Sequence, residues 1–240
     1  MQEGMYGERA EFYDPIYHWK DYQGEAERLR NILKDLGIPE GSRVLEAGCG
    51  TGSHMAFLRS WFQISGFDLS EAMLAVARKK LPGIPLFRAD MTDFQIPEAA
   101  ALLCLFSAIG YVYPEARLRS AAGAFARAVR PGGALIVEPW LTEESFTPGH
   151  ISMHTYDGPE LKLSRMAVGR KEGALSVIDF HWMALRKGTT DAERFSERHT
   201  TWLCPLKTLL AAFREAGFEV RYEPDGLMKD RGLLIGRRRA

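Results

Sequence analysis

The strongest constraint on the fold of this chain is the segment 45–52, which reads Leu-Glu-Ala-Gly-Cys-Gly-Thr-Gly. Glycine occupies every second position after the acidic Glu46, and glycine lets a backbone turn tightly and lie against a ligand. The dinucleotide-binding fingerprint requires a glycine at position 53, where this chain has Ser53. A P-loop requires Gly-Lys followed by Ser or Thr, and the sequence contains no such motif. The segment therefore predicts a strand, a ligand-binding turn and a helix, and it argues against both of those nucleotide-binding motifs.

Three further apolar runs each end in polar residues: 62–67 in Asp68, 84–89 in Asp90 and Met91, and 101–106 in Ser107. A carboxylate at the position of Asp68 can accept two hydrogen bonds from a ribose diol. Asp90 could accept one from an adenine amino group, while the backbone N–H of Met91 faces a ring nitrogen. Because parallel strands end at the same edge of a sheet, these ends predict a single site for one nucleoside ligand. Either aspartate alone could instead be a helix N-cap or a turn residue.

This order of features resembles the cofactor-binding region of class I S-adenosylmethionine (SAM) methyltransferases, although the glycine turn alone would fit any glycine-rich strand-to-helix connection. The resemblance implies a Rossmann-like core whose cofactor is SAM. The positions that it assigns to the cofactor are Tyr22, Glu46, Gly48, Gly50, Thr51, Gly52, His54, Asp68, Leu69, Asp90, Met91 and Phe106. His54 begins the helix after the turn, where it would either touch the methionyl end of SAM or simply cap the helix at the surface.

Strands alternate with helical stretches from about residue 25 to residue 140, a pattern typical of a parallel sheet with helices on both faces. The pattern returns after Pro205, with a helix at 206–216 and strands at 218–222 and 233–235. We expect one α/β domain with a doubly wound, seven-stranded, mostly parallel sheet of the class I methyltransferase type and an antiparallel β insertion over the active site. Its expected parts within 1–240 are an N-terminal segment 1–24, a SAM-binding core at 25–140 and 204–240, and the insertion at 141–203.

The insertion has mostly period-two hydrophobicity, which predicts strands at about 161–167, 175–185 and 194–202. In the second of these, Asp179 and His181 share one face, and Phe180 and Trp182 share the other. Such a sheet could cover the carboxyl ends of the parallel strands, where ligands bind. We expect it to contribute to acceptor binding.

The first 24 residues are unusually aromatic for a mostly polar stretch, with Tyr6, Phe12, Tyr13, Tyr17, Trp19 and Tyr22. Aromatic side chains that stack and exclude water would suit a lid segment that closes over a cofactor. The alternative is a short helix that packs its aromatic side chains on the core.

The composition excludes several classes of protein. The 240 residues include 31 basic and 31 acidic side chains, whereas polyanion binding requires a concentration of Lys and Arg, so we expect no nucleic-acid partner. The three cysteines are far apart and lack a C-x-x-C spacing, which favours free thiols in a cytosolic protein. The longest apolar window, 99–113, is too short to span a membrane, and the N-terminus has no signal-peptide pattern. A cytoplasmic location and no membrane partner are expected.

A narrower resemblance rests on motifs spread over nearly the whole chain: Tyr13-Asp14-Pro15 with Tyr17, the stretch 46–54, Asp90-Met91, 106–110, Pro131-Gly132-Gly133, Val137-Glu138-Pro139-Trp140, His181-Trp182 and Arg231-Gly232-Leu233. Together they resemble the dTDP-amino-deoxysugar N,N-dimethyltransferases, the enzymes that finish desosamine and mycaminose for macrolide antibiotics. The glycine turn marks only the superfamily. The motifs outside the SAM-binding core are more specific, because those regions shape the acceptor site.

Enzymes of this family use SAM to methylate a sugar amine twice, and they hold the sugar through its nucleotide diphosphate. The resemblance therefore implies a SAM-dependent N-methyltransferase whose partner is a small-molecule acceptor, a dTDP-linked amino-deoxysugar. The expected acceptor-binding residues are Tyr13, Tyr17, Ser107, Trp140, Arg165, Asp179 and Arg231. A guanidinium fork suits a diphosphate, although Arg165 and Arg231 could also be surface ion-pair residues, and Trp140 could be core packing.

The chain departs from the family at position 111, where the family typically has histidine after Ile-Gly and this chain has Tyr111. A tyrosine can donate a hydrogen bond, but with an ordinary pKa near 10 it is a poor base. Either this position is not essential or the acceptor differs.

Methyl transfer from a sulfonium to an amine requires a neutral nitrogen in line with the methyl carbon, and holding that geometry can supply about 7–11 kcal/mol. We therefore prefer a mechanism of approximation without an indispensable base. Tyr111 and His181 are the candidate catalytic residues that could orient the amine or accept its proton, with Asp179 as a further polar candidate. His181 could equally be a hydrogen-bonded strand histidine. No metal is expected, since His150 and His154 lie in a Pro-Gly loop without helical context.

Other functions remain open from the sequence. The first alternative is a SAM-dependent methyltransferase for another small-molecule amine or hydroxyl, which the change at position 111 permits. A nicotinamide oxidoreductase and a non-catalytic SAM-binding protein are further alternatives, against which the glycine spacing and the arginine pair argue. The sequence leaves open the sugar, the position of its amine, the number of methyl groups, the need for a base and the oligomeric state, for which a homodimer is one possibility.

Overall fold

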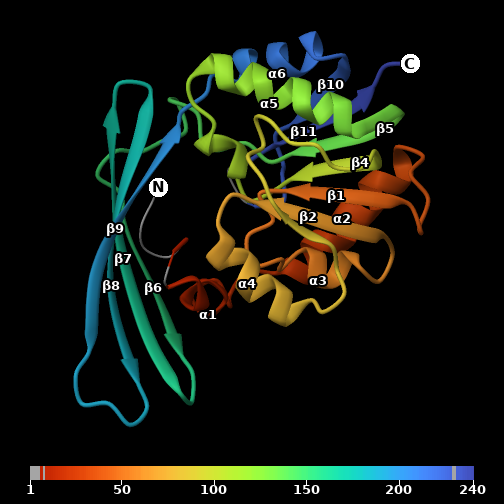
Figure 1. Cartoon of the computed structure of the whole chain (residues 1–240). Coiled ribbons are helices and arrows are strands. Elements are labelled where there is room, and N and C mark those ends of the chain that lie inside the picture. The colour runs from red at the N-terminus through yellow and green to blue at the C-terminus, as the bar shows by residue number, and fades with distance from the viewer. Residues whose placement is uncertain (1–5, 8, 229–230) are drawn as a thin grey trace.

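The computed structural model describes residues 6–7, 9–228 and 231–240, and it contains two sheets with helices around one of them (Figure 1). The larger sheet has seven strands in the order β10-β11-β5-β4-β1-β2-β3. Strand β11 runs antiparallel to both β10 and β5, and the other neighbouring pairs are parallel. The strands are β1 (Arg43–Ala47), β2 (Gln63–Asp68), β3 (Leu86–Arg88), β4 (Ala99–Cys104), β5 (Val129–Val137), β10 (Phe218–Glu223) and β11 (Leu233–Arg238). The predicted seven-stranded, mostly parallel α/β fold is therefore confirmed.

Helices cover both faces of this sheet: α2 (Tyr22–Asp35), α3 (Met55–Leu58), α4 (Glu71–Lys80), α5 (Glu115–Ala128) and α6 (Leu206–Glu215). Strand β4 is buried at every position, as expected for a central strand covered on both sides. Phe125 and Phe213 belong to the core cluster on one face, and Leu29 and Leu33 belong to the cluster on the other. The result is a doubly wound sheet whose strands β1, β2, β3 and β4 end at one edge.

The second sheet is antiparallel and contains four strands in sequence order, β6 (Ile151–Asp157), β7 (Leu161–Glu172), β8 (Leu175–Arg186) and β9 (Glu193–Trp202). The sequence predicted only the last three. Strand β6 is an edge strand whose residues are all exposed or half-buried, so its hydrophobic alternation is weak. His154 lies in this strand rather than in a loop, which corrects the prediction for that residue.

Residues 10–16 of the N-terminal segment lie between the second sheet and α4 (Figure 1). Its two short helices are η1 (Ala10–Phe12) and α1 (Tyr13–Ile16). Phe12 and Ile16 are buried in a cluster with Met73 from α4 and Trp182 from β8. Part of the aromatic N-terminal segment therefore belongs to a hydrophobic core between the two sheets. This agrees with the alternative that a short helix packs its aromatic side chains on the core.

The two faces of the second sheet differ in polarity and burial. The inner face carries buried residues such as Arg165, Phe180 and Trp182. The outer face exposes Met166 and Met183 together with ion pairs of Asp179. In the described part of the chain, no helix has the length and apolar character to cross a membrane. The three cysteines are free, as predicted.

Candidate active site

The glycine turn after β1 requires glycine for geometric reasons. Gly48, Gly50 and Gly52 have φ angles of 68°, 55° and 75°, which L side chains rarely adopt. A Cβ on Gly48 would lie 2.7 Å from the Cβ of Ala108, which is closer than van der Waals contact allows. The turn therefore presents bare backbone at the edge of the sheet where the strands end.

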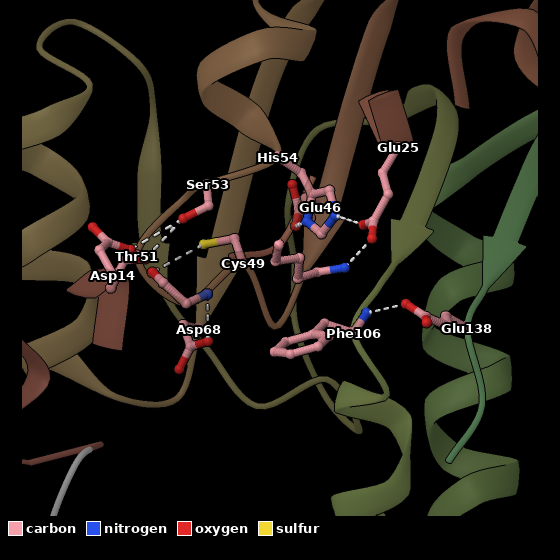
Figure 2. Close-up of polar contacts among 12 residues, drawn as sticks. Asp14, Glu25, Glu46, Cys49, Thr51, Ser53, His54, Asp68, Phe106 and Glu138 are labelled. Carbon is pink, nitrogen blue, oxygen red and sulfur yellow. Dashed lines mark hydrogen bonds and ion pairs between the residues drawn. The ribbon is translucent and has the colours of Figure 1, made fainter. Parts of the chain in front are cut away.

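Asp68 at the end of β2 is held by the backbone around it (Figure 2). Its Oδ2 accepts the N–H of Gly50 at 2.9 Å, and its Oδ1 accepts the N–H of Ser70 at 2.8 Å. Burial raises the pKa of Asp68, and these two N–H donors oppose that rise. The Leu69 N–H also bonds this carboxylate, which has about four acceptor positions, so the group can still accept a hydrogen bond from a diol.

Glu46 in β1 is 3% exposed, and its Oε2 has no hydrogen-bond partner among the described residues. Its Oε1 lies 3.8 Å from His54 Nδ1. Burial raises the pKa of Glu46 to about 7. A buried, unpartnered carboxylate oxygen is unfavourable until a donor or cation reaches it. The α-ammonium group of SAM is such a cation, so these residues fit the cofactor.

A buried chain of charged groups connects the turn to the N-terminal segment, and the sequence did not predict it. His54 Nε2 lies 2.7 Å from Glu25 Oε2, and the Lys20 ammonium donates to the other oxygen of Glu25. Lys20 Nζ also lies 4.8 Å from the centroid of the Phe106 ring. His54 is 4% exposed, so it is an internal hydrogen-bonding residue rather than a surface cap.

Thr51 contacts the N-terminal segment through its hydroxyl, which donates to Asp14 Oδ1 at 2.6 Å (Figure 2). The other oxygen of Asp14 forms an ion pair with Lys80 Nζ, also at 2.6 Å. These contacts tie α1 to the glycine turn and to the last turn of α4. Tyr22 completes this side, because its ring packs edge-on against His54 with the centroids 4.9 Å apart.

The ends of β2 and β3 supply three more of the predicted cofactor residues, Leu69, Asp90 and Met91. Leu69 is 60% exposed although it is apolar, as expected for a side chain that a ligand covers. Met91 lies against the glycine turn, since its Cε is 3.4 Å from where a Cβ of Gly48 would be. The Asp90 carboxylate already accepts from Thr92 and pairs with Arg117 at 2.8 Å. Both oxygens of Asp90 are therefore engaged before any ligand binds.

Phe106 and Ser107, just beyond β4, both have left-handed backbones, with φ angles of 49° and 62°. This conformation is strained for residues other than glycine, and such strain is found at functional sites. Glu138 beyond β5 holds it, because its Oε2 accepts the Phe106 N–H at 2.7 Å (Figure 2). The Ser107 hydroxyl donates to the carbonyl of Pro139 at 2.8 Å. Glu138 Oε1 is buried and has no hydrogen-bond partner among the described residues.

Tyr13, Tyr17 and Arg165 lie together on the side of Phe106 that faces the second sheet. The Tyr17 ring packs edge-on against Phe106, with the centroids 5.1 Å apart, and at a tilt against Tyr13, with the centroids 4.8 Å apart. Arg165 Nη1 donates to the Tyr17 hydroxyl at 2.9 Å, and its guanidinium carbon lies 4.6 Å from the Phe180 ring centroid. Arg165 is 4% exposed, and its Nε has no hydrogen-bond partner among the described residues.

Arg231 and Trp140 form the opposite wall. Arg231 Nη1 donates to Ser107 Oγ at 3.1 Å, and its guanidinium carbon lies 4.6 Å from the Trp140 ring centroid. Trp140 Nε1 donates to Ser176 Oγ in β8 at 2.8 Å. Both residues line a cavity of about 530 Å³ whose other walls are the segment 141–145 after β5, the start of α6 and Tyr222 of β10. Within the described residues, neither Arg165 nor Arg231 forms an ion pair.

The structure separates the polar candidates of the insertion into two groups. Asp179 and His181 lie on the outer face of the second sheet, where Asp179 pairs with Arg170 and Arg198, and His181 bonds Ser196 at 2.9 Å. The structure therefore does not bring them to the strand ends. His199, which the sequence did not single out, lies on the inner face and is 5% exposed, with Nδ1 2.7 Å from the Tyr111 hydroxyl.

Comparisons with known proteins give one consistent result. Residues 44–133 match the family model described as a methyltransferase domain. The chain is 34% identical to dTDP-3-amino-3,6-dideoxy-alpha-D-glucopyranose N,N-dimethyltransferase of Streptomyces fradiae, over 96% of this chain and 91% of the relative.

Solved structures agree. The crystal structure of Streptomyces venezuelae DesVI superimposes with a TM-score of 0.91 at 31% identity, covering 97% of this chain and 99% of DesVI. The structure of SAM-bound CalS10, an amino pentose methyltransferase from Micromonospora echinaspora, gives 0.85 at 28% identity, covering 99% of this chain and all of CalS10 (100%).

Proposed function

Because this chain belongs to the class I SAM-dependent methyltransferases, in the family of the dTDP-amino-sugar N,N-dimethyltransferases, we propose that it methylates the amine of a nucleotide-linked amino-deoxysugar. Activity as a SAM-dependent methyltransferase follows from the family, and SAM as cofactor was predicted correctly from the sequence. The identity of the acceptor is what we propose beyond the family assignment. It rests on the acceptor side of the site rather than on the glycine turn, which many methyltransferases share.

Residues at the strand ends would hold SAM, which when bound supplies an electrophilic methyl group. Asp68 would accept from the ribose hydroxyls, and Glu46 would pair with the α-ammonium group through its unpartnered Oε2. Leu69 and Met91 would pack against the adenine, with Asp90 at its rim. Tyr22, His54 and Phe106 would enclose the methionyl end, since they surround the buried Lys20.

The observation that carries the acceptor assignment is the state of Arg231. Its guanidinium group lies against Trp140 beside a cavity of about 530 Å³, bonds the Ser107 hydroxyl and forms no ion pair within the described residues. An arginine in this state can bind a phosphate oxygen without first breaking an ion pair. Arg165, likewise without an ion pair, would face the same ligand from the second sheet. Two such cations suit an acceptor that carries a dianionic diphosphate better than a small amine that has no phosphate group.

The catalytic contribution of the chain is then mainly positional. Tyr13, Tyr17 and Trp140 would hold the sugar ring, while the arginines, one of them oriented by the Ser107 hydroxyl oxygen, would bind its diphosphate, so that the neutral amine meets the methyl carbon in line. Alignment of this kind can supply about 7–11 kcal/mol. The α1 segment, tied to the glycine turn through Asp14, would cover the cofactor and exclude water.

A homodimer is the assembly that we propose, because the outer face of the second sheet exposes apolar side chains. These are Ile151, Met153, Met166, Val168, Met183 and Leu185. A second copy packed on this face would bury them without obstructing the inner face and its site.

Mass spectrometry of the products from a panel of dTDP-linked amino sugars with SAM tests the proposal. The expected product carries one or two methyl groups on nitrogen, and the corresponding free amino sugars and hydroxyl sugars should react far more slowly. Equal turnover of free and nucleotide-linked sugars, or methylation of oxygen alone, would contradict the proposal and favour another small-molecule amine or hydroxyl as acceptor.

A further inference from the structure

Tyr111 and His199 come from segments 88 residues apart and form a direct hydrogen bond, with 2.7 Å between the Tyr111 hydroxyl and His199 Nδ1. Tyr111 ends the short helix η2 (Ala108–Tyr111), which begins directly after Ser107. His199 lies in β9 on the inner face of the second sheet. The pair therefore joins the strand end of the core to the sheet that covers it.

Glu197 favours a proton on one particular nitrogen of His199. Its Oε1 lies 3.5 Å from His199 Nε2, too far for a strong hydrogen bond but near enough for charge to act, and it also accepts the Trp182 indole N–H at 3.0 Å. A neighbouring carboxylate favours a proton on the nitrogen that faces it, here Nε2. In the neutral imidazole, Nδ1 is then an acceptor, so the Tyr111 hydroxyl is the donor in the bond between them.

This polarity fixes what Tyr111 can offer to a ligand. With its hydrogen directed at His199, its oxygen has only lone pairs for other partners. One of them receives the Tyr6 hydroxyl at 3.1 Å, and the second remains available. Tyr111 keeps 38% of its surface exposed, and the Arg231 charge acts on it. Part of Tyr111 is therefore accessible to a ligand.

We infer that His199 is a positioning residue for methyl transfer, which holds the Tyr111 hydroxyl hydrogen so that the Tyr111 oxygen accepts an N–H of the acceptor amine. The inference rests on the proposed function and deepens it. An N–H bond to this oxygen orients the nitrogen lone pair away from Tyr111. The family typically has a histidine at position 111. In this chain the imidazole of His199 would instead act on the amine through Tyr111.

The same pair also provides a route for the proton that the methylated nitrogen must lose. The N–H bond of the ammonium product breaks with its electron pair left on nitrogen, and the proton passes to the Tyr111 oxygen. The Tyr111 O–H bond breaks toward His199 Nδ1 at the same time. The tyrosine stays neutral, and the imidazolium that forms lies beside the Glu197 carboxylate. Atoms and charge balance without a further reactant.

A tyrosine acting alone could not take this role at neutral pH. Burial raises the pKa of Tyr111 above its ordinary value; the Tyr6 hydrogen bond and Arg231 lower it, while Tyr17 and Glu197 raise it. No phenolate therefore forms under physiological conditions. The groups that face His199 are Tyr6, Tyr111 and Glu197, together with the uncharged Phe180 ring at 4.9 Å.

Long-range ¹H–¹⁵N NMR of the labelled full-length protein, without any ligand, tests the tautomer directly. His199 should be protonated at Nε2, and Glu197→Gln should raise the fraction protonated at Nδ1. A wild-type His199 protonated at Nδ1 would overturn the inference, because Tyr111 would then be the acceptor in this bond. This readout is independent of activity and therefore of the proposed function.

Kinetics with the acceptor that the wild type methylates provide the second test, using His199→Gln and the matched control His150→Gln, whose side chain is exposed ahead of β6. We expect His199→Gln to lower kcat at least about tenfold near pH 7 and to change the pH profile of kcat, with the KM for SAM unchanged. His150→Gln should keep the wild-type profile. An unaltered pH profile in a folded His199→Gln protein would overturn the inference.

Tyr111→His distinguishes a functional pair from a structural one. This substitution places an imidazole directly beside the acceptor, so adding His199→Gln to it should cost less than His199→Gln costs in the wild type. Equal losses in both backgrounds would contradict the inference. If the wild type methylates none of the amino sugars, the proposed function fails, whereas the NMR result still decides the polarity of the pair.

Discussion

Asp68 and Gly50 are joined by a hydrogen bond of 2.9 Å from the Gly50 N–H to the Asp68 carboxylate. The bond ties the end of β2 to the glycine turn after β1, although the two residues belong to different strand-to-helix connections. Asp68 is therefore fixed before any ligand arrives, and its remaining lone pairs have a set direction. A preorganised acceptor loses little entropy when it binds a diol.

Asp68→Asn should weaken SAM binding by about tenfold or more. The substitution removes the charge and one acceptor oxygen, and a hydrogen bond to a charged group contributes about 1.5–3 kcal/mol. Isothermal titration calorimetry measures the effect, with the exposed Asp157→Asn as control. An affinity equal to that of the wild type would remove Asp68 from the ribose site.

The stability of the ligand-free protein should fall as the pH rises from about 5 to 8, in part because of Glu46. Burial raises its pKa to about 7, whereas an unfolded chain titrates near 4.3. The folded state then binds more protons than the unfolded state within this window. The contribution of Glu46 to the free energy of unfolding is therefore fully present below pH 4.3 and is lost as the pH rises through 7. The loss is on the order of 3 kcal/mol.

Thermal denaturation across that pH range measures the effect. Glu46→Gln should show a smaller fall in Tm than the wild type, since an amide does not ionise. SAM should raise the wild-type Tm more at pH 8 than at pH 5.5, because its ammonium group pairs with the carboxylate form. A SAM-induced shift that is the same at both pH values would contradict the pairing with Glu46.

Arg231→Ala should raise the KM of the nucleotide-linked acceptor at least about tenfold, while the KM for SAM changes by less than about twofold. The reason is the loss of a charged donor at the diphosphate, on the far side of Ser107 from the glycine turn. Steady-state kinetics with each substrate varied in turn give both constants. Arg221→Ala, which removes an exposed arginine paired with Glu223, is the control. Equal changes in both constants would exclude Arg231 from the acceptor site.

His181→Ala should retain nearly wild-type kcat, because this side chain lies on the outer face of the second sheet and bonds Ser196. Single-turnover assays with saturating SAM compare it with His199→Gln. If His181→Ala abolished turnover in a folded protein, the outer face would have to contribute to catalysis, for example through the partner copy in a dimer.

The sequence was a good guide to the core because the signals there are local. A buried strand, a turn residue and a helix recur along the chain, and Asp68 lies where the second strand was expected to end. The boundaries were less accurate. Pro131-Gly132-Gly133 has the composition of a turn but lies inside β5, which begins at Val129 and pairs with β4 through an irregular register.

The acceptor side could not be predicted in the same way, because its residues meet across long distances in sequence. Alternation along β8 correctly separates His181 from Phe180, but which face points inward is decided by packing against Phe12 and Ile16. In β9 the same alternation puts Glu197 and His199 on one face. That this face points inward follows only from the register of β9 with β8, which pairs Glu197 with the inward-facing Phe180. No sequence pattern around Lys20 indicates that this lysine is buried beside Glu25.

The most direct test of the whole account is a crystal structure of the protein with S-adenosylhomocysteine and dTDP. We expect the ribose on Asp68, the α-ammonium group beside Glu46, and the diphosphate on Arg231 with the thymidine in the cavity next to Trp140. A nucleoside bound away from the ends of β1 and β2, or a diphosphate that does not contact Arg231, would contradict the account.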